Sequence, residues 1–69
     1  MKRYTMQYSE SRKPWQDGPR EFTSLKAARE HFDEMARGTS LDWRVGFLLR
    51  VRSGVTYRLF DRKKETVVE

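Results

Sequence analysis

The residues best suited to chemistry in this chain are the arginines of residues 43–62, WRVGFLLRVRSGVTYRLFDR. Two runs rich in β-branched and aromatic residues flank Arg52-Ser53-Gly54, where glycine can end a three-residue hairpin loop in the left-handed conformation. That loop places Leu49 opposite Tyr57 and makes one face of the hairpin apolar, whereas a two-residue loop would turn every side chain over, so we reject it. The other face then carries Arg44, Leu48, Arg50, Thr56, Arg58, Phe60 and Arg62.

This basic face has three interpretations. Guanidinium groups around an aromatic ring suit nucleic acid, because arginine neutralises phosphate and phenylalanine stacks on bases. They also suit an acidic protein, since arginine binds carboxylates through paired hydrogen bonds. The third interpretation is that the sheet carries polar groups outward only for solubility. We predict a module that binds nucleic acid or a nucleoprotein complex, with an acidic protein surface as the alternative partner, through Arg3, Trp15, Arg44, Leu48, Arg50, Arg52, Arg58, Phe60, Arg62, Lys63 and Lys64.

The charge distribution favours the same segment. The formal net charge is +5, but residues 43–64 hold seven Lys or Arg against one Asp, while residues 21–42 hold three against five acidic residues. A basic excess on one element is typical of a protein with an acidic or polyanionic partner.

Signatures of catalysis are weak. His31 is the only histidine, and although Glu30 and Glu34 are spaced to share a helix face with it, the metal-binding pattern HExxH is missing. The four glycines are scattered and form no phosphate loop, and the chain has no cysteine, which fits a reducing compartment. We therefore expect no enzyme, no cofactor and no metal, and a cytoplasmic location.

Two further residues each allow two interpretations. Gly46 falls within the predicted strand opposite Phe60, where it either gives that ring room or allows a ligand to approach closely. Trp15 either folds back over an edge of the core or stays exposed as an anchor for a partner.

The remaining segments predict the elements that carry these residues. Residues 2–9 alternate between apolar and polar, which is typical of a half-buried strand. Residues 9–20 contain two prolines and a glycine and indicate a long loop that is functional, mobile, or partly a hairpin whose residues 20–23 return as a short strand. Val67-Val68 either extends the last strand or frays.

A helix is predicted to follow, with Ser24 as its N-cap and Gly38 as a left-handed cap at its end. Its apolar stripe consists of Leu25, Ala28, Phe32, Met35 and Ala36. The opposite side is a solvated face with i,i+4 charge pairs at Lys26/Glu30, Arg29/Asp33 and Asp33/Arg37.

These elements predict one α+β domain over residues 1–69, ordered β-α-β-β, or ββ-α-ββ if the loop returns as a strand, with the helix packed on one face of a mainly antiparallel sheet. The covered face would consist of Tyr4, Met6, Tyr8, Val45, Phe47, Leu49, Val51, Val55, Tyr57 and Leu59. The sheet is wholly antiparallel if the first strand lies beside residues 55–62, whereas pairing with residues 44–51 would be parallel. No apolar run is long enough for a signal peptide or a membrane span, and like charges on the basic face favour a monomer over a dimer.

The layout resembles that of many small proteins of phages, prophages and plasmids, including some small anti-CRISPR proteins of type I systems. The resemblance lies in the strand, the turn-rich loop, the helix start Phe22-Thr23-Ser24-Leu25-Lys26-Ala27-Ala28-Arg29-Glu30-His31-Phe32 and the basic hairpin. It implies a phage-type protein that blocks a host nucleoprotein defence complex by binding to it.

Overall fold

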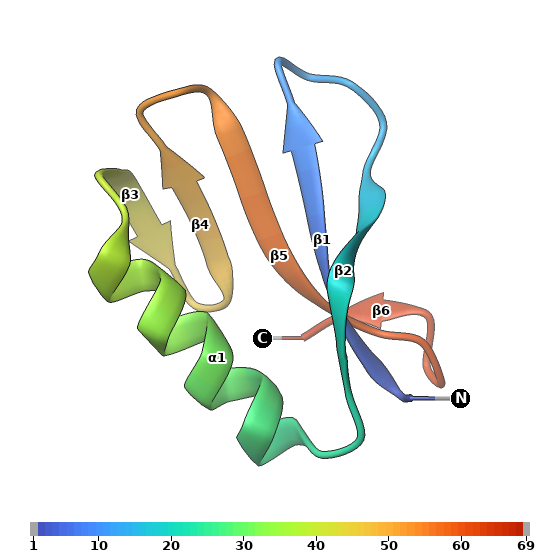
Figure 1. Cartoon of the computed structure of the whole chain (residues 1–69). Coiled ribbons are helices and arrows are strands. Elements are labelled where there is room, and N and C mark those ends of the chain that lie inside the picture. The colour runs from blue at the N-terminus through green and yellow to red at the C-terminus, as the bar shows by residue number, and fades with distance from the viewer. Residues whose placement is uncertain (1, 69) are drawn as a thin grey trace.

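The computed structural model describes residues 2–68 and shows a small α+β domain in which one helix covers an antiparallel sheet of six strands (Figure 1). The elements are β1 (Tyr4–Glu10), β2 (Gln16–Phe22), α1 (Leu25–Gly38), β3 (Leu41–Val45), β4 (Leu48–Val51), β5 (Val55–Asp61) and β6 (Thr66–Val67). The strand order is β2-β1-β5-β4-β3, and β6 pairs with β5. No helix of the described residues is long and apolar enough to span a membrane.

The first strand returns as a hairpin, as the ββ-α-ββ layout predicted, but the returning strand is longer than residues 20–23 and four strands, not two, follow the helix. β1 pairs with β2 and with β5, both antiparallel, so the parallel pairing with residues 44–51 does not occur. Of the alternatives predicted for residues 9–20, the partial hairpin is confirmed: β1 extends to Glu10 and β2 begins at Gln16, so only residues 11–15 form a connection. Pro19 fits because β2 is an edge strand, where a missing amide hydrogen costs no sheet hydrogen bond.

The predicted register of the second hairpin is confirmed. Leu49 lies opposite Tyr57 and Arg50 opposite Thr56. Gly54 has a φ of 85°, and its amide donates to the Val51 carbonyl at 3.0 Å, which closes the loop Arg52-Ser53-Gly54. A left-handed glycine at the third loop position is what this loop length requires.

Residues 44–51, predicted as one strand, are two strands joined by a tight turn. Gly46 has a positive φ of 56°, whereas the φ of Phe47 is not positive. The two residues therefore form a two-residue turn with glycine at its first position. Val45 then pairs with Leu48 and is 66% exposed, not buried beneath the helix as predicted. A Cβ on Gly46 would meet nothing within 4 Å, so its interpretation as room for the Phe60 ring is wrong, and the turn accounts for the glycine.

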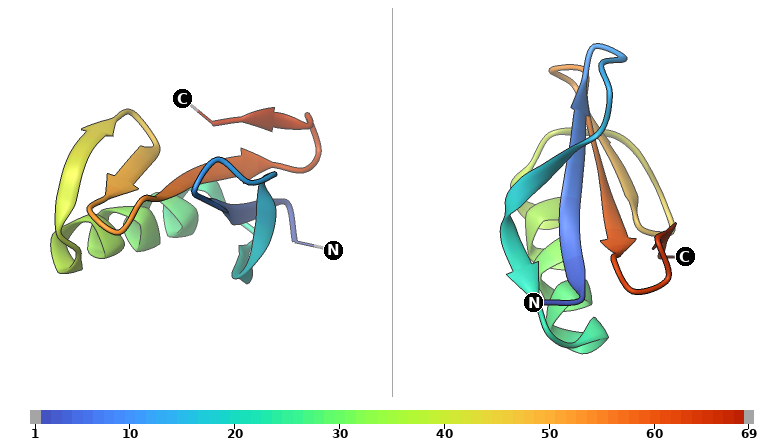
Figure 2. Two further views of the ribbon diagram at one scale, coloured as in Figure 1. Left: turned by 90° about the horizontal axis from the view of Figure 1, so that it is seen from above. Right: turned by 90° about the vertical axis from the view of Figure 1, so that its right-hand side faces the viewer.

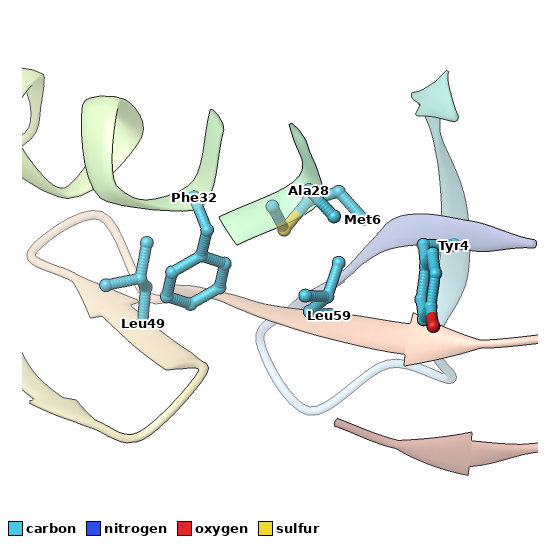
Figure 3. Packing of buried hydrophobic residues seen from close by; sticks show 6 residues of the cluster. All are labelled: Tyr4, Met6, Ala28, Phe32, Leu49 and Leu59. Atoms are coloured by element: carbon cyan, nitrogen blue, oxygen red, sulfur yellow. The ribbon is translucent and has the colours of Figure 1, made fainter. Parts of the chain in front are cut away.

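The core lies between α1 and the sheet (Figure 3). Its buried cluster consists of Tyr4, Met6, Ala28, Phe32, Leu49 and Leu59. The predicted stripe of the helix is confirmed, since its remaining members Leu25, Met35 and Ala36 pack against this cluster. Burial of this apolar stripe stabilises the helix more than its intrinsic propensity does.

The helix begins as predicted and ends differently. The Ser24 hydroxyl accepts a hydrogen bond from the Ala27 amide at 3.2 Å, which confirms the N-cap. Gly38, however, is the last helical residue and is not left-handed; the C-cap is Thr39, which has extended backbone. Asp33 forms its ion pair with Arg44 of β3 and not with the predicted helical partners. The C-terminal valines neither fray nor extend the last strand: Val67 belongs to the separate strand β6, opposite Phe60 of β5, and the Val68 amide donates to the Leu59 carbonyl at 2.8 Å.

Gly18 marks a close approach between β2 and β1. The register of the two strands shifts next to Met6, and a Cβ on Gly18 would lie 2.6 Å from the Met6 carbonyl oxygen. We expect Gly18→Ala to lower the free energy of unfolding by about 1–3 kcal/mol, because backbone must move to relieve the overlap. Gly38→Ala is the matched control: its Cβ would meet nothing within 4 Å, and alanine in a helix should add about 0.5–1 kcal/mol. Urea unfolding of both variants checks the opposite signs; equal changes would contradict the close approach.

Candidate functional site

The helix covers one face of the sheet and leaves the opposite face without a helix (Figure 2). The strand registers place polar, basic and aromatic side chains on that opposite face. We call it the open face. Because side chains alternate along a strand, the residues opposite Arg58 and its neighbours across β1 and β4 share this face. It comprises Gln7, Ser9, Trp43, Val45, Leu48, Arg50, Thr56, Arg58 and Phe60.

Arg58 lies at the centre of the open face and holds Trp15 against it. Its guanidinium lies 4.1 Å from the centroid of the Trp15 ring and 5.7 Å from that of Phe60. Its Nε donates to Gln7 Oε1 at 2.8 Å, and partial burial lowers the pKa of Arg58 from its ordinary value. Trp15 therefore folds back as the first interpretation predicted, but it covers the open face and not the core, and it stays partly exposed.

A hollow of about 330 Å³ lies beside Trp15, between the β1–β2 loop and β3–β4. Its lining residues are Ser9, Ser11, Arg12, Trp15, Trp43, Arg50, Gly54 and Thr56. Trp43 of β3 lies opposite Arg50 of β4, and Trp43 is 37% exposed. We call this hollow the tryptophan hollow, since both tryptophans of the chain line it.

The β1–β2 loop adopts an unusual backbone where it meets the hollow. Ser11 and Arg12 have φ values of 48° and 65°, which non-glycine residues seldom adopt. The Lys13 amide donates to the Glu10 carbonyl at 2.9 Å, closing a tight turn around them. The Ser11 amide also donates to the Gly54 carbonyl at 3.4 Å, which joins this turn to the β4–β5 loop.

Arg44 does not lie on the open face as predicted. The turn at Gly46-Phe47 reverses the chain, so that Arg44 is opposite Leu49 and faces the helix. There it forms an ion pair with Asp33, and its guanidinium lies 5.5 Å from the Phe32 ring centroid. Arg44 therefore ties β3 to α1.

Arg62 is neutralised by two acids of β2. It lies 2.8 Å from Glu21 Oε2 and 3.3 Å from Asp17 Oδ2, and its side chain is 23% exposed. Its position ties the edge strand β2 to the end of β5. The positive charge of Arg62, which was predicted to bind a partner, is therefore largely neutralised by acidic residues of the same protein.

Arg3 is similarly engaged inside the protein. Its Nε and Nη2 donate to the two carboxylate oxygens of Asp61 at 3.0 and 2.9 Å. Asp61 is 5% exposed and also accepts from the Lys63 amide at 3.0 Å. The guanidinium lowers the pKa of Asp61 to about 2.

The other predicted residues remain accessible to different degrees. Arg50 is 53% exposed in its side chain, and its Nε lies 3.8 Å from Asp42 Oδ2. Leu48 and Phe60 are half-buried on the open face. Arg52, Lys63 and Lys64 are exposed in turns: Arg52 lies in the β4–β5 loop, where its amide donates to the Ser40 carbonyl at 3.2 Å, while the lysines follow β5 at its other end.

Trp43 and Arg12 are the residues of this site that sequence reasoning missed. Trp43 is not among the residues predicted for the basic face, and only the turn at Gly46 brings it beside Arg50. Arg12 lay in a loop whose Ser-Arg pair lacks the Asn-Gly signal of a turn with two positive φ angles. The position of Trp43 had a usable sequence signal, because Gly46 can begin a two-residue hairpin turn. The position of Arg12 had none.

The acidic residues do not gather into a metal site in the part of the chain that is described. No group of three or more His, Cys, Asp or Glu side chains is placed to hold an ion there. His31 packs against Phe22, with ring centroids 5.3 Å apart.

Comparison with known proteins identifies no relative, since no family model, curated protein or solved structure matches the chain.

Proposed function

We propose that this protein binds nucleic acid through its open face. The observation that carries the proposal is the tryptophan hollow, which is lined by Trp15 and Trp43 together with Arg12 and Arg50. Indoles provide stacking surfaces for bases, and guanidinium groups bind phosphate oxygens. A small inhibitor of a nucleoprotein complex, as the phage resemblance implies, would use the same groups on the nucleic acid of that complex.

A purely solubilising role explains this surface less well. Solubility requires polar and charged groups, which threonine and arginine supply without an aromatic partner. Trp43 nevertheless remains 37% exposed next to Arg50. Tryptophan and arginine are the residues that most often contribute strongly to binding a partner, and here they lie together.

Binding to an acidic protein would use the arginines alone. Carboxylates satisfy Arg12 and Arg50 but gain nothing from an indole ring, whereas nucleotides use both kinds of group. The arrangement therefore favours nucleic acid, and an acidic polypeptide serves as a competing probe.

The test is fluorescence anisotropy with labelled 12-nucleotide DNA and RNA, and with labelled poly-glutamate, at 50 to 200 mM NaCl. We expect oligonucleotide binding that weakens roughly 20-fold over this range, as contact with about three phosphates predicts for a single strand. Absence of oligonucleotide binding at 50 mM NaCl, or tighter binding of poly-glutamate, would overturn the proposal.

Charge-removal variants test the surface itself. Arg12→Gly with Arg50→Ala should weaken oligonucleotide binding at least tenfold at 50 mM NaCl, because two phosphate contacts are lost. Glycine suits the φ of 65° at Arg12, so this double variant should remain folded. Lys26→Ala with Arg37→Ala removes the same charge from exposed positions of α1 and should change affinity less than twofold. Equal losses in both double variants would mean that net charge, and not the open face, determines binding.

A further inference from the structure

We infer that the tryptophan hollow accepts an unpaired nucleobase, so that the protein selects single strands over duplexes. This inference rests on the proposed function and specifies its ligand. It is carried by four features: the rings of the hollow, its basic rim, the backbone that shapes it, and the side of the sheet on which it lies.

Two aromatic residues from separate elements line the hollow. Trp15 comes from the β1–β2 loop and Trp43 from the edge strand β3, and indole rings offer stacking surfaces to a base. Arg58 holds the Trp15 ring at 4.1 Å, which limits the side-chain freedom that binding would otherwise remove. At about 330 Å³ the hollow is at the lower end of small-molecule sites, which suits one base and not a stacked pair.

The rim supplies the groups that the rest of a nucleotide needs. Arg12 and Arg50 belong to elements far apart in sequence and both line the hollow. Their guanidinium groups can bind the phosphates on either side of an inserted base. Ser11 and Thr56 add hydroxyl groups, which both donate and accept hydrogen bonds at a base edge.

The backbone at the hollow is held in a costly conformation. Ser11 and Arg12 both have positive φ, a conformation that costs a non-glycine residue free energy and persists only where the surrounding structure fixes it. The hydrogen bonds to Glu10 and Gly54 fix the turn, as does the Ser9 hydroxyl, which donates to the Lys13 carbonyl. A turn that only connected two strands would not need an arginine at a position with positive φ. The β1–β2 turn places Arg12 in the lining of the hollow.

A duplex does not offer what this site can bind. Paired bases are stacked on each other and expose only their edges, so neither indole could reach a base face. The element that commonly enters a major groove is a basic helix, but α1 carries three basic and three acidic residues and covers the other side of the sheet. Unpaired bases, in contrast, can leave the strand and enter the hollow.

The experiment compares nucleic-acid ligands of equal length that differ in whether they offer unpaired bases. Labelled dT12, rU12, an abasic 12-mer and a 12-base-pair duplex are titrated with the full chain at 100 mM NaCl. We expect dT12 or rU12 to bind at least tenfold more tightly than the abasic strand and the duplex. Because both tryptophans line the hollow, intrinsic fluorescence should be quenched by dT12 or rU12 and not by the abasic strand. The DNA and RNA arms distinguish the two sources of the base.

A variant separates stacking from charge. Trp43→Ala should weaken dT12 or rU12 binding by about 5- to 100-fold, as loss of one stacked base predicts, and leave the weak abasic binding unchanged. Glu34→Gln, at an exposed position of α1 on the other side of the sheet, should change neither affinity. Circular dichroism checks that both variants are folded.

The outcomes are distinguishable. Equal affinity for dT12, rU12 and the abasic strand, a preference for the duplex, or unchanged binding by Trp43→Ala would overturn the inference while the proposed function stands. Failure of every oligonucleotide to bind at 50 mM NaCl would overturn both.

Discussion

Phe32→Ala should leave the protein unfolded at 25 °C. Phe32 is fully buried in the core between α1 and the sheet (Figure 3). Its ring meets Phe47 edge-on, with centroids 5.6 Å apart. Truncating a buried phenylalanine costs about 3–5 kcal/mol. A single core in a chain of this size supplies no more than about 3–5 kcal/mol of stability, so the loss removes most or all of it. Far-ultraviolet circular dichroism and the spread of amide signals in an NMR spectrum measure the result.

Val45→Ala provides the matched control for this variant. It also shortens an apolar side chain, but Val45 is 66% exposed at the β3–β4 turn. Its free energy of unfolding should stay within about 0.5 kcal/mol of the parent. If Phe32→Ala instead unfolds cooperatively at nearly the same urea concentration as the parent, the core would not depend on the contact between α1 and the sheet.

The parts of this fold that could be predicted are those with local signals. The apolar spacing of the helix predicted that Phe32 faces the core, and the Ser24 cap predicted where the helix begins. Gly54 fixed the length of its loop, and with it the register that places Leu49 opposite Tyr57. Each of these signals is contained within one element or one turn, so no tertiary contact was needed to interpret it.

The error at Gly46 shows how one turn changes a site. Residues 44–51 have continuous β propensity, and glycine beside phenylalanine is a weaker turn signal than Asn-Gly. Because a turn reverses the order in which side chains alternate, Arg44 moved to the helix side and Trp43 to the open face. The basic face was therefore predicted in part, at Arg50 and Arg58, while its second tryptophan was not.

Partners of the arginines could not be predicted from spacing. Arg62 meets Asp17 and Glu21 because β2 returns beside β1, and Arg3 meets Asp61 from 58 residues away. Such pairs depend on the whole sheet order. They convert much of the basic excess seen in the sequence into internal ion pairs, which leaves Arg12 and Arg50 as the principal charges at the tryptophan hollow.

The same internal pairing predicts how stability depends on pH. We expect Asp61→Asn to have a clearly lower thermal midpoint than the parent at pH 7, because it leaves the Arg3 guanidinium without its carboxylate. The pKa of Asp61 is lowered to about 2 from an ordinary 3.8, chiefly by its hydrogen bonds to Arg3. The stabilising effect of this carboxylate is therefore complete above about pH 4 and is lost as the pH falls through 2. The difference in thermal midpoint between the parent and Asp61→Asn should narrow as the pH falls from 4 to 2, and it should stay constant from pH 5 to 7.

The difference in thermal midpoint between the parent and Asp61→Asn excludes the contribution of the other carboxylates, because these titrate in both proteins. Asparagine keeps an oxygen that can accept from the Lys63 amide, so Asp61→Asn isolates the charge from the turn that follows β5. Glu34→Gln removes one carboxylate from an exposed position of α1 and should stay close to the parent at every pH. Thermal unfolding followed by circular dichroism from pH 2 to 7 measures all three proteins. A gap that is as wide at pH 2 as at pH 7 would show that Asp61 stabilises the fold through its shape and not through its charge.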